Sequence, residues 1–157
     1  QDDPGHVRAA FADFGGLAHV LLNALSEVYL WGLFRHPIAE YWFQDRSVLI
    51  GDAAHPMLPF LAQGANMALE DAWVLSRALR LHGATRQGFQ RYQSLRQGRV
   101  KKVVATAQSN ARNYHLSAPL TRWVAHSALR GLGAVAPCAM LKRFDWLYRF
   151  NPDTGLP

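Results

Sequence analysis

Cysteine is nearly absent from this chain of 157 residues, in which Cys138 is the only one. A single cysteine excludes an intrachain disulfide and favours a reducing compartment, so we expect a cytoplasmic protein. Cys138 stands between Pro137 and Ala139 in an apolar segment. That setting predicts a small buried side chain rather than a reactive nucleophile.

Long apolar runs and targeting signals are also absent. No run approaches the roughly 20 residues of a membrane-spanning helix, so no membrane partner is expected. The segment from Gln1 to Gly5 has neither the basic nor the apolar region of a signal peptide, and it does not begin with Met. We therefore expect a chain cut from a longer one.

Motifs of metal and serine-nucleophile sites are missing as well. The histidines lack the spacing of metal ligands, and neither HExxH nor GxSxG occurs, so no metal site is expected. We interpret His55 and His115 as structural, although histidine is the usual acid–base group near neutral pH.

Charge is unbalanced, with a formal net charge of +6 and many basic residues between Arg77 and Arg112. This pattern is compatible with nucleic-acid binding, with attraction of anionic ligands and with a solvated helix face. We expect the solvated face and no nucleic-acid partner. Half of the residues are hydrophobic and 18% are charged, which is typical of a globular protein.

Apolar spacing predicts a helix-rich chain with two strands. The predicted helices cover residues 7–14, 17–25, 66–82, 88–114, 120–132 and 136–150. The predicted strands cover residues 27–34 and 47–51, and the consecutive apolar residues 48–50 suggest burial on both faces. Two strands form a poor sheet alone, so we expect partner strands outside this sequence.

Helix boundaries rest on individual residues. Asn66 is the expected N-cap of helix 66–82, and Gly83 is its expected left-handed stop. Along helix 88–114, one apolar stripe is expected to contain Phe89, Tyr92, Val100, Val103, Ala107, Ala111 and Tyr114. Residues 131–136 match the loose pattern G-x-G-x-x-A, but the residues before them read as a helix. We therefore expect a helix stop and a turn there rather than a dinucleotide-binding loop.

The segment around residues 48–66 carries the strongest functional pattern. An apolar strand ends in Gly51-Asp52, a proline-rich loop follows, and Gln63-Gly64-Ala65-Asn66 opens a helix. A carboxylate at a strand end beside free helix-start amides suits a ligand with hydroxyls at one end and electron-rich oxygens at the other. Two alternatives stay open: Asp52 could cap its own turn through the Ala54 or His55 amide, and the helix start could simply be solvated.

Residues 48–72 resemble the second flavin-binding motif of the FAD-dependent aromatic hydroxylases, which are single-component flavoprotein monooxygenases. The resemblance is strongest to salicylate, hydroxybenzoate and hydroxynicotinate hydroxylases. It extends to residues 31–34 with Pro37 and Trp42, to residues 113–117 with Pro119, and to residues 144–148. It therefore covers nearly the whole chain, but only the second half of a family member.

The resemblance implies a fold class and a division of the chain. The class is a helix-rich α+β fragment, the C-terminal part of a para-hydroxybenzoate-hydroxylase-like FAD-binding fold without its N-terminal Rossmann unit. Residues 1–46 would end the substrate and sheet region, residues 47–83 would form the strand–loop–helix flavin motif, and residues 84–157 would form the C-terminal helices. All three would belong to one partial domain.

The resemblance also implies site residues. Asp52, next to Gly51, matches the residue that binds the ribityl chain of FAD, and the amides of Gly64, Ala65 and Asn66 match those that face the pyrimidine edge of the flavin. Pro59 and Phe60 match positions near the aromatic substrate. Several relatives carry His or Tyr where this chain has Phe60, which leaves the substrate undefined. The catalytic residues stay unknown.

The implied activity is NAD(P)H-dependent, O2-consuming hydroxylation of an aromatic small molecule. The sequence does not distinguish NADH from NADPH. In the family, a GxGxxG unit holds the rest of FAD, and no credible copy occurs here. We therefore expect weak or absent FAD binding and no activity without the missing half. Alternatives are a non-enzymatic helical interaction or dimerisation module that forms homo-oligomers, and a basic nucleic-acid-binding domain.

Overall fold

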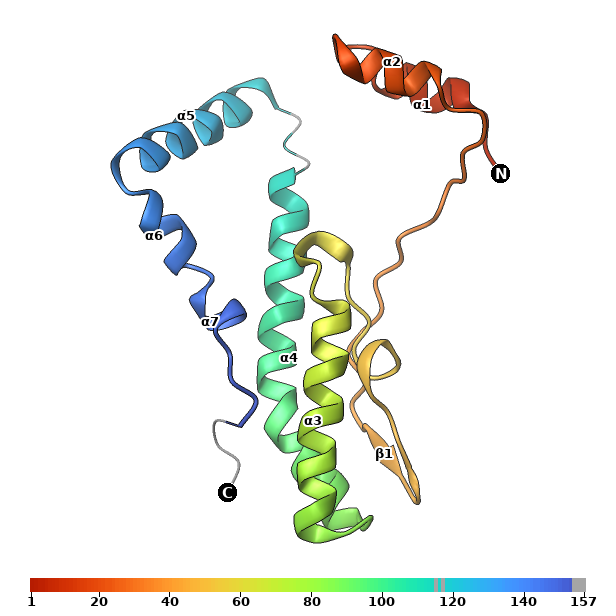
Figure 1. The fold of residues 1–157 in the computed structure, drawn as a ribbon, viewed down its shortest axis with the longest axis vertical. Coiled ribbons are helices and arrows are strands. Elements are labelled where there is room, and N and C mark those ends of the chain that lie inside the picture. Colours follow the sequence, from red (N-terminus) through yellow and green to blue (C-terminus); the bar gives the residue numbers. More distant parts are fainter. Residues whose placement is uncertain (115, 117, 154–157) are drawn as a thin grey trace. The chain divides into compact units, whose positions relative to one another are not determined.

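The computed structural model describes residues 1–114, 116 and 118–153 (Figure 1). The chain divides into two compact units, residues 1–34 and residues 35–157, and each is described by itself. The helices and strands in chain order are α1 (Pro4–Ala10), α2 (Leu17–Asn23), β1 (Phe43–Gln44), β2 (Ser47–Val48), the 3₁₀ helices η1 (Gly51–Ala53) and η2 (Pro59–Leu61), α3 (Gly64–His82), α4 (Arg86–Tyr114), α5 (Pro119–Val135), α6 (Pro137–Lys142) and α7 (Asp145–Tyr148).

The first unit contains the two short helices that were predicted. The helix α1 begins three residues earlier than expected, and α2 begins at Leu17 as predicted but ends two residues earlier. Asp3 caps α1 by accepting a hydrogen bond from the Gly5 amide at 2.8 Å, and Pro4 occupies the first turn. The predicted strand 27–34 is wrong for this unit, because only Val28 makes a bridge, to Asp2. Residues 29–34 have no partner strand in this unit, and large side chains such as Trp31 (80% exposed) face solvent.

The second unit begins with a small hairpin. Phe43 pairs with Val48 and Gln44 with Ser47, and Asp45 takes a positive φ of 51° in the tight turn. The predicted strand 47–51 therefore survives only at its start. Burial on both faces is wrong, since Leu49 and Ile50 are 38% and 41% exposed.

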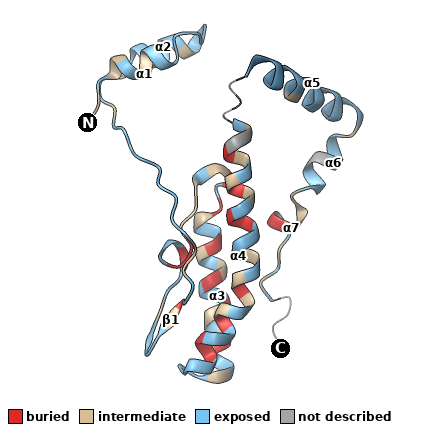
Figure 2. Cartoon of the chain, turned by 180° about the vertical axis from the view of Figure 1, so that it is seen from behind, coloured by how far each residue is buried: buried red, intermediate tan, exposed pale blue. Residues whose placement is uncertain are grey.

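The core lies between α3 and α4, which run side by side and are joined by a short turn (Figure 1). Most of the buried positions fall on these two helices (Figure 2). The predicted long helix is confirmed, and its apolar stripe is buried except for Tyr114, which is 67% exposed. Gly83 ends α3 with φ 71°, as predicted. Trp42 enters the core from the hairpin and packs 5.5 Å from Tyr92, measured between ring centroids.

The C-terminal helices depart from expectation at several points. The helix stop predicted within residues 131–136 is present, since α5 ends at Val135 with Ala136 as its C-cap. It comes three residues later than the predicted helix end at residue 132, because Gly131 and Gly133 cost only about 1 kcal/mol each relative to Ala and do not break the helix. The predicted helix 136–150 is interrupted between α6 and α7. Cys138 is exposed rather than buried, because no described segment covers its side of α6.

Candidate functional site

The turn of residues 51–55 presents Asp52 outward. Gly51 has φ 56°, and the amides of Ala54 and His55 both donate to its carbonyl oxygen at 2.9 Å. Those two amides are therefore not capped by Asp52, which removes the turn-capping alternative. A Cβ on residue 51 would lie 3.0 Å from the Cβ of Ala68 on α3, so both the backbone and the close packing require glycine.

The carboxylate of Asp52 lies beside the start of α3. Its Oδ1 atom is 3.9 Å from the position that a Cβ on Gly64 would occupy. The Asp52 side chain is exposed, and it has no hydrogen-bond partner among the described residues. The predicted neighbours Asp52 and Gly64 are thus close in space.

The start of α3 offers free backbone donors. Its first intrahelical bond runs from the Met67 amide to the Gln63 carbonyl at 2.9 Å, so the amides of Gly64, Ala65 and Asn66 precede the hydrogen-bonded ladder. The prediction that Asn66 is the N-cap is wrong. That position belongs to Gln63, and the Asn66 side chain donates to Gln63 Oε1 at 3.3 Å.

A buried ion cluster lies directly behind the turn. Asp71 on α3 is fully buried, and its Oδ2 atom accepts from the Gly51 amide at 2.9 Å and pairs with His55 Nε2 at 2.6 Å. Its Oδ1 atom accepts from Arg96 Nε at 2.7 Å. Burial alone would raise the pKa of Asp71, but the hydrogen bonds from His55, Arg96 and Gly51 outweigh it and hold that pKa below its usual range.

The cluster continues from Arg96 to the C-terminal segment. Glu70 accepts from Arg96 Nη1 at 2.5 Å and from two Arg99 nitrogens at 2.7 Å each. Arg99 also donates to the carbonyls of Trp146 and Leu147 at 3.0 and 3.1 Å. The expectation of a solvated basic face is therefore wrong for Arg96 and Arg99, whose side chains are 1% and 9% exposed.

Sequence interpretation missed this cluster, although a signal existed. Asp71 falls on the buried stripe of α3 between Met67 and Val74, and Arg96 falls between Tyr92 and Val100 on α4. Two opposite charges on facing apolar stripes indicate a buried ion pair, because an unpaired charge would not be tolerated there.

His55 is buried with its Nε2 on Asp71, and its Nδ1 has no partner among the described residues. Its ring lies 5.3 Å from that of Trp42. This placement fits a structural role. His115 lies outside the described residues. Pro59 and Phe60 belong to η2, where the Phe60 ring lies 5.9 Å from the Tyr114 ring.

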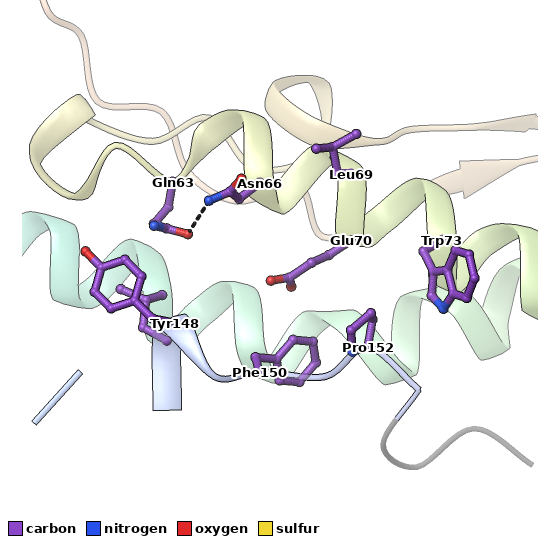
Figure 3. A pocket seen from close by; sticks show the side chains of 9 residues that line it. Gln63, Asn66, Leu69, Glu70, Trp73, Tyr148, Phe150 and Pro152 are labelled. Carbon is purple, nitrogen blue, oxygen red and sulfur yellow. Dashed lines mark hydrogen bonds between the residues drawn. The ribbon is translucent and has the colours of Figure 1, made fainter. Parts of the chain in front are cut away.

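A hollow of about 360 Å³ lies between α3 and the C-terminal segment (Figure 3). It is lined by Gln63, Asn66, Leu69, Glu70, Trp73, Leu147, Tyr148, Phe150 and Pro152. Asp52, Gly64 and Ala65 are not among these residues, but Asn66 is, so the hollow meets the start of α3 without including Asp52.

Neither a metal-binding cluster nor a membrane-spanning helix occurs in the part of the chain that the structure describes. No group of three or more His, Cys, Asp or Glu side chains is arranged to hold a metal ion. Within the same part of the chain, no helix combines the length and the apolar character that crossing a membrane requires.

Known proteins resemble this chain over most of its length. The family described as the FAD binding domain matches residues 18–107. A 3-amino-4-hydroxybenzoate 2-monooxygenase of Streptomyces platensis is 39% identical over 72% of this chain and 29% of its own length. The salicylate hydroxylase of Pseudomonas putida is 36% identical over 94% of this chain and 33% of its own. A 3-hydroxybenzoate 6-hydroxylase of Aquipseudomonas alcaligenes is 37% identical over 96% of this chain and 46% of its own.

The chain thus spans less than half the length of these curated relatives, which are all aromatic ring monooxygenases or hydroxylases. The matched residues include the turn at Asp52, the start of α3 and the buried cluster around Asp71. On these grounds the chain belongs to the FAD binding domain family, and its sequence is similar to those of aromatic ring monooxygenases and hydroxylases.

Proposed function

We propose that this chain is the flavin-contacting portion of an NAD(P)H- and O2-dependent aromatic ring hydroxylase. The observation that carries the proposal is the exposed carboxylate of Asp52, which has no hydrogen-bond partner among the described residues and lies beside the free amides at the start of α3. The relatives are named for hydroxylation of amino-hydroxybenzoate, salicylate and hydroxybenzoate, which supports an aromatic acid as the substrate class.

The residues present fit one end of FAD. Ribityl hydroxyls can donate hydrogen bonds to the carboxylate of Asp52. Flavin carbonyl oxygens can accept hydrogen bonds from the amides of Gly64, Ala65 and Asn66. Gly64 leaves the approach open, since a Cβ there would meet only Asp52 within 4 Å among the described residues. Bound FAD would supply the redox and oxygen chemistry, with NADH or NADPH as the reductant.

Each part of the site has its own task. Asp52 holds the sugar-alcohol chain and so fixes the ring along its length. The amides of Gly64, Ala65 and Asn66 stand at the positive end of the α3 dipole, where they stabilise negative charge at the pyrimidine edge. Pro59 and Phe60 form the wall toward the aromatic substrate, and the apolar Phe60 ring offers it no polar group.

We propose that the site is completed by residues outside this chain. Three observations support this: the chain spans 29% to 46% of the relatives' length, apolar residues 29–34 have no partner strand in their unit, and Leu49 and Ile50 are exposed just before the turn. No GxGxxG follows a strand in the described residues. We therefore expect weak FAD binding and no hydroxylation by this chain alone.

Replacement of Asp52 by Asn tests the flavin role. Loss of a charged acceptor for ribityl hydroxyls is expected to weaken FAD binding about tenfold. Affinity is measured by titrating the ¹⁵N-labelled chain with FAD and following the amides of Gly64, Ala65 and Asn66. Asp13→Asn removes an exposed carboxylate of the first unit and serves as the control, with no expected change. The absence of saturable shifts in the unmodified chain would refute the proposal, as would equal affinity of Asp52→Asn.

A further inference from the structure

We propose that Asp71 is a positioning residue for flavin binding, because its buried carboxylate fixes the 51–55 turn and thereby aims Asp52 at the start of α3. This inference rests on the proposed function and adds a residue that does not itself touch the ligand.

One oxygen atom of Asp71 holds both ends of the turn. Oδ2 accepts from the Gly51 amide at 2.9 Å and pairs with His55 Nε2 at 2.6 Å. Asp52 lies between these two anchor points and has no partner of its own among the described residues. Its direction is therefore set by the backbone of the turn, and the backbone is set by Asp71.

The contacts of Asp71 with Gly51 and His55 fix the turn to the helix that also carries Gly64. Asp71 and Gly64 both belong to α3, about two helical turns apart. Tying Gly51 to Asp71 thus fixes the spacing between the Asp52 carboxylate and the amides on the same helix. The close approach of Gly51 to Ala68 holds the turn against α3 from a second point.

Asp71 is itself held in place. It is 0% exposed, and Arg96 Nε occupies its other oxygen at 2.7 Å. Arg96 is in turn bonded to Glu70 and to the Met67 carbonyl, both also on α3. On the other side of the turn, the Tyr92 hydroxyl donates to the Leu49 carbonyl at 3.2 Å. The strand end that leads into Gly51 is therefore tethered to α4.

A carboxylate suits this task better than an amide. Its two oxygens accept the Gly51 amide, His55 and Arg96 together, because each oxygen has two lone pairs. In Asp71→Asn one oxygen is replaced by an NH2 group, which is a donor facing donors. At least one of the three hydrogen bonds is then lost, and the turn is released on that side.

The test is a double-mutant cycle for FAD affinity, measured by the same titration. Asp71→Asn is expected to weaken binding three- to tenfold in the unmodified chain and to have no further effect in an Asp52→Ala background, because Asp71 acts through Asp52. Glu70→Gln is the matched control: it alters the same ion cluster without touching the turn, and FAD affinity should stay within twofold.

The outcomes separate the two proposals. Saturable binding that Asp71→Asn leaves unchanged, or weakens equally in both backgrounds, overturns the positioning role and spares the flavin site. No binding by the unmodified chain overturns both. If Asp71→Asn does not fold, His55→Leu and His55→Gln examine the same contacts. Leu should weaken binding and Gln, which keeps a donor, should restore it; equal affinities for the two would overturn the role.

Discussion

Asp71 and Arg96 are fully charged groups in the least solvated part of the protein, with side chains 0% and 1% exposed. Such a pair is stable only when each partner's hydrogen-bonding groups are satisfied, and removal of one partner from a buried pair costs about 3–5 kcal/mol. Here Asp71 has three donors, and Arg96 reaches two carboxylates and a carbonyl. The cluster is therefore expected to make the free energy of unfolding decrease at acidic pH.

Stability is expected to fall below about pH 4 through Asp71. Its pKa in the folded protein lies below its ordinary value of 3.8, because hydrogen bonds from His55, Arg96 and Gly51 outweigh the opposing effect of burial. A depressed folded pKa stabilises the protein above the unfolded pKa, and that stabilisation is lost as the pH falls through the folded pKa. Urea unfolding at a series of acidic pH values should show a shallower decline for Asp71→Asn than for the unmodified chain. Asp13→Asn should keep the original slope, and identical slopes for all three would contradict the assignment.

Charge on an apolar stripe was the main obstacle to predicting the site. The motif at Gly51-Asp52 and the nearby Gly64 could be read from the sequence because they are consecutive signals with a known local geometry. Asp71 and Arg96 were missed, because periodicity alone treats charged residues as exposed and their signal appears only when two stripes 25 positions apart are compared. The prediction that Cys138 is buried was wrong for a related reason: burial depends on what packs over a residue, not on its own polarity.

The helices α3 and α4 meet through a turn that two glycines make feasible. Gly83 has φ 71°, and a Cβ on Gly88 would collide with the Gly83 carbonyl oxygen. Helix existence was predictable here because the 3.6-residue period is continuous from Phe89 to Ala111. The predicted strand 27–34 failed because a strand depends on distant partners, which a local pattern does not contain.

Two Gly→Ala replacements in α4 are expected to have opposite effects on stability. Gly88→Ala forces a methyl group against the turn and should destabilise the protein by about 1–3 kcal/mol. Gly98 has nothing within 4 Å of its Cβ position among the described residues, so Gly98→Ala should stabilise by about 0.5–1 kcal/mol through higher helix propensity. Urea unfolding of both variants checks the pair. If Gly88→Ala is as stable as the unmodified chain, the turn accommodates a methyl group and the prediction is wrong.

The proposed site accounts for contacts to only part of a dinucleotide flavin. In that proposal the Asp52 carboxylate and the α3 amides contact the ribityl chain and the ring, whereas the described residues contain no phosphate-binding loop for the adenosine end. The share of the relatives' length that this chain covers, 29% to 46%, agrees with that division.

Riboflavin should therefore bind this chain about as tightly as FAD, within roughly threefold, because both present the same ring and ribityl hydroxyls. ADP should not compete. Isothermal titration calorimetry or NMR titration with riboflavin, FAD and ADP tests this directly. A large preference for FAD, or competition by ADP, would mean that the chain contacts the adenosine half and that the proposed division of the site is wrong.

The exposed thiol of Cys138 also has a practical consequence. Because it is the only cysteine of the chain, a maleimide fluorophore attaches at one known position on α6 without any mutagenesis. Its emission and anisotropy would then report on events around the C-terminal helices. When a candidate complementing polypeptide is added to the labelled chain, a change in emission or anisotropy would reveal assembly in real time.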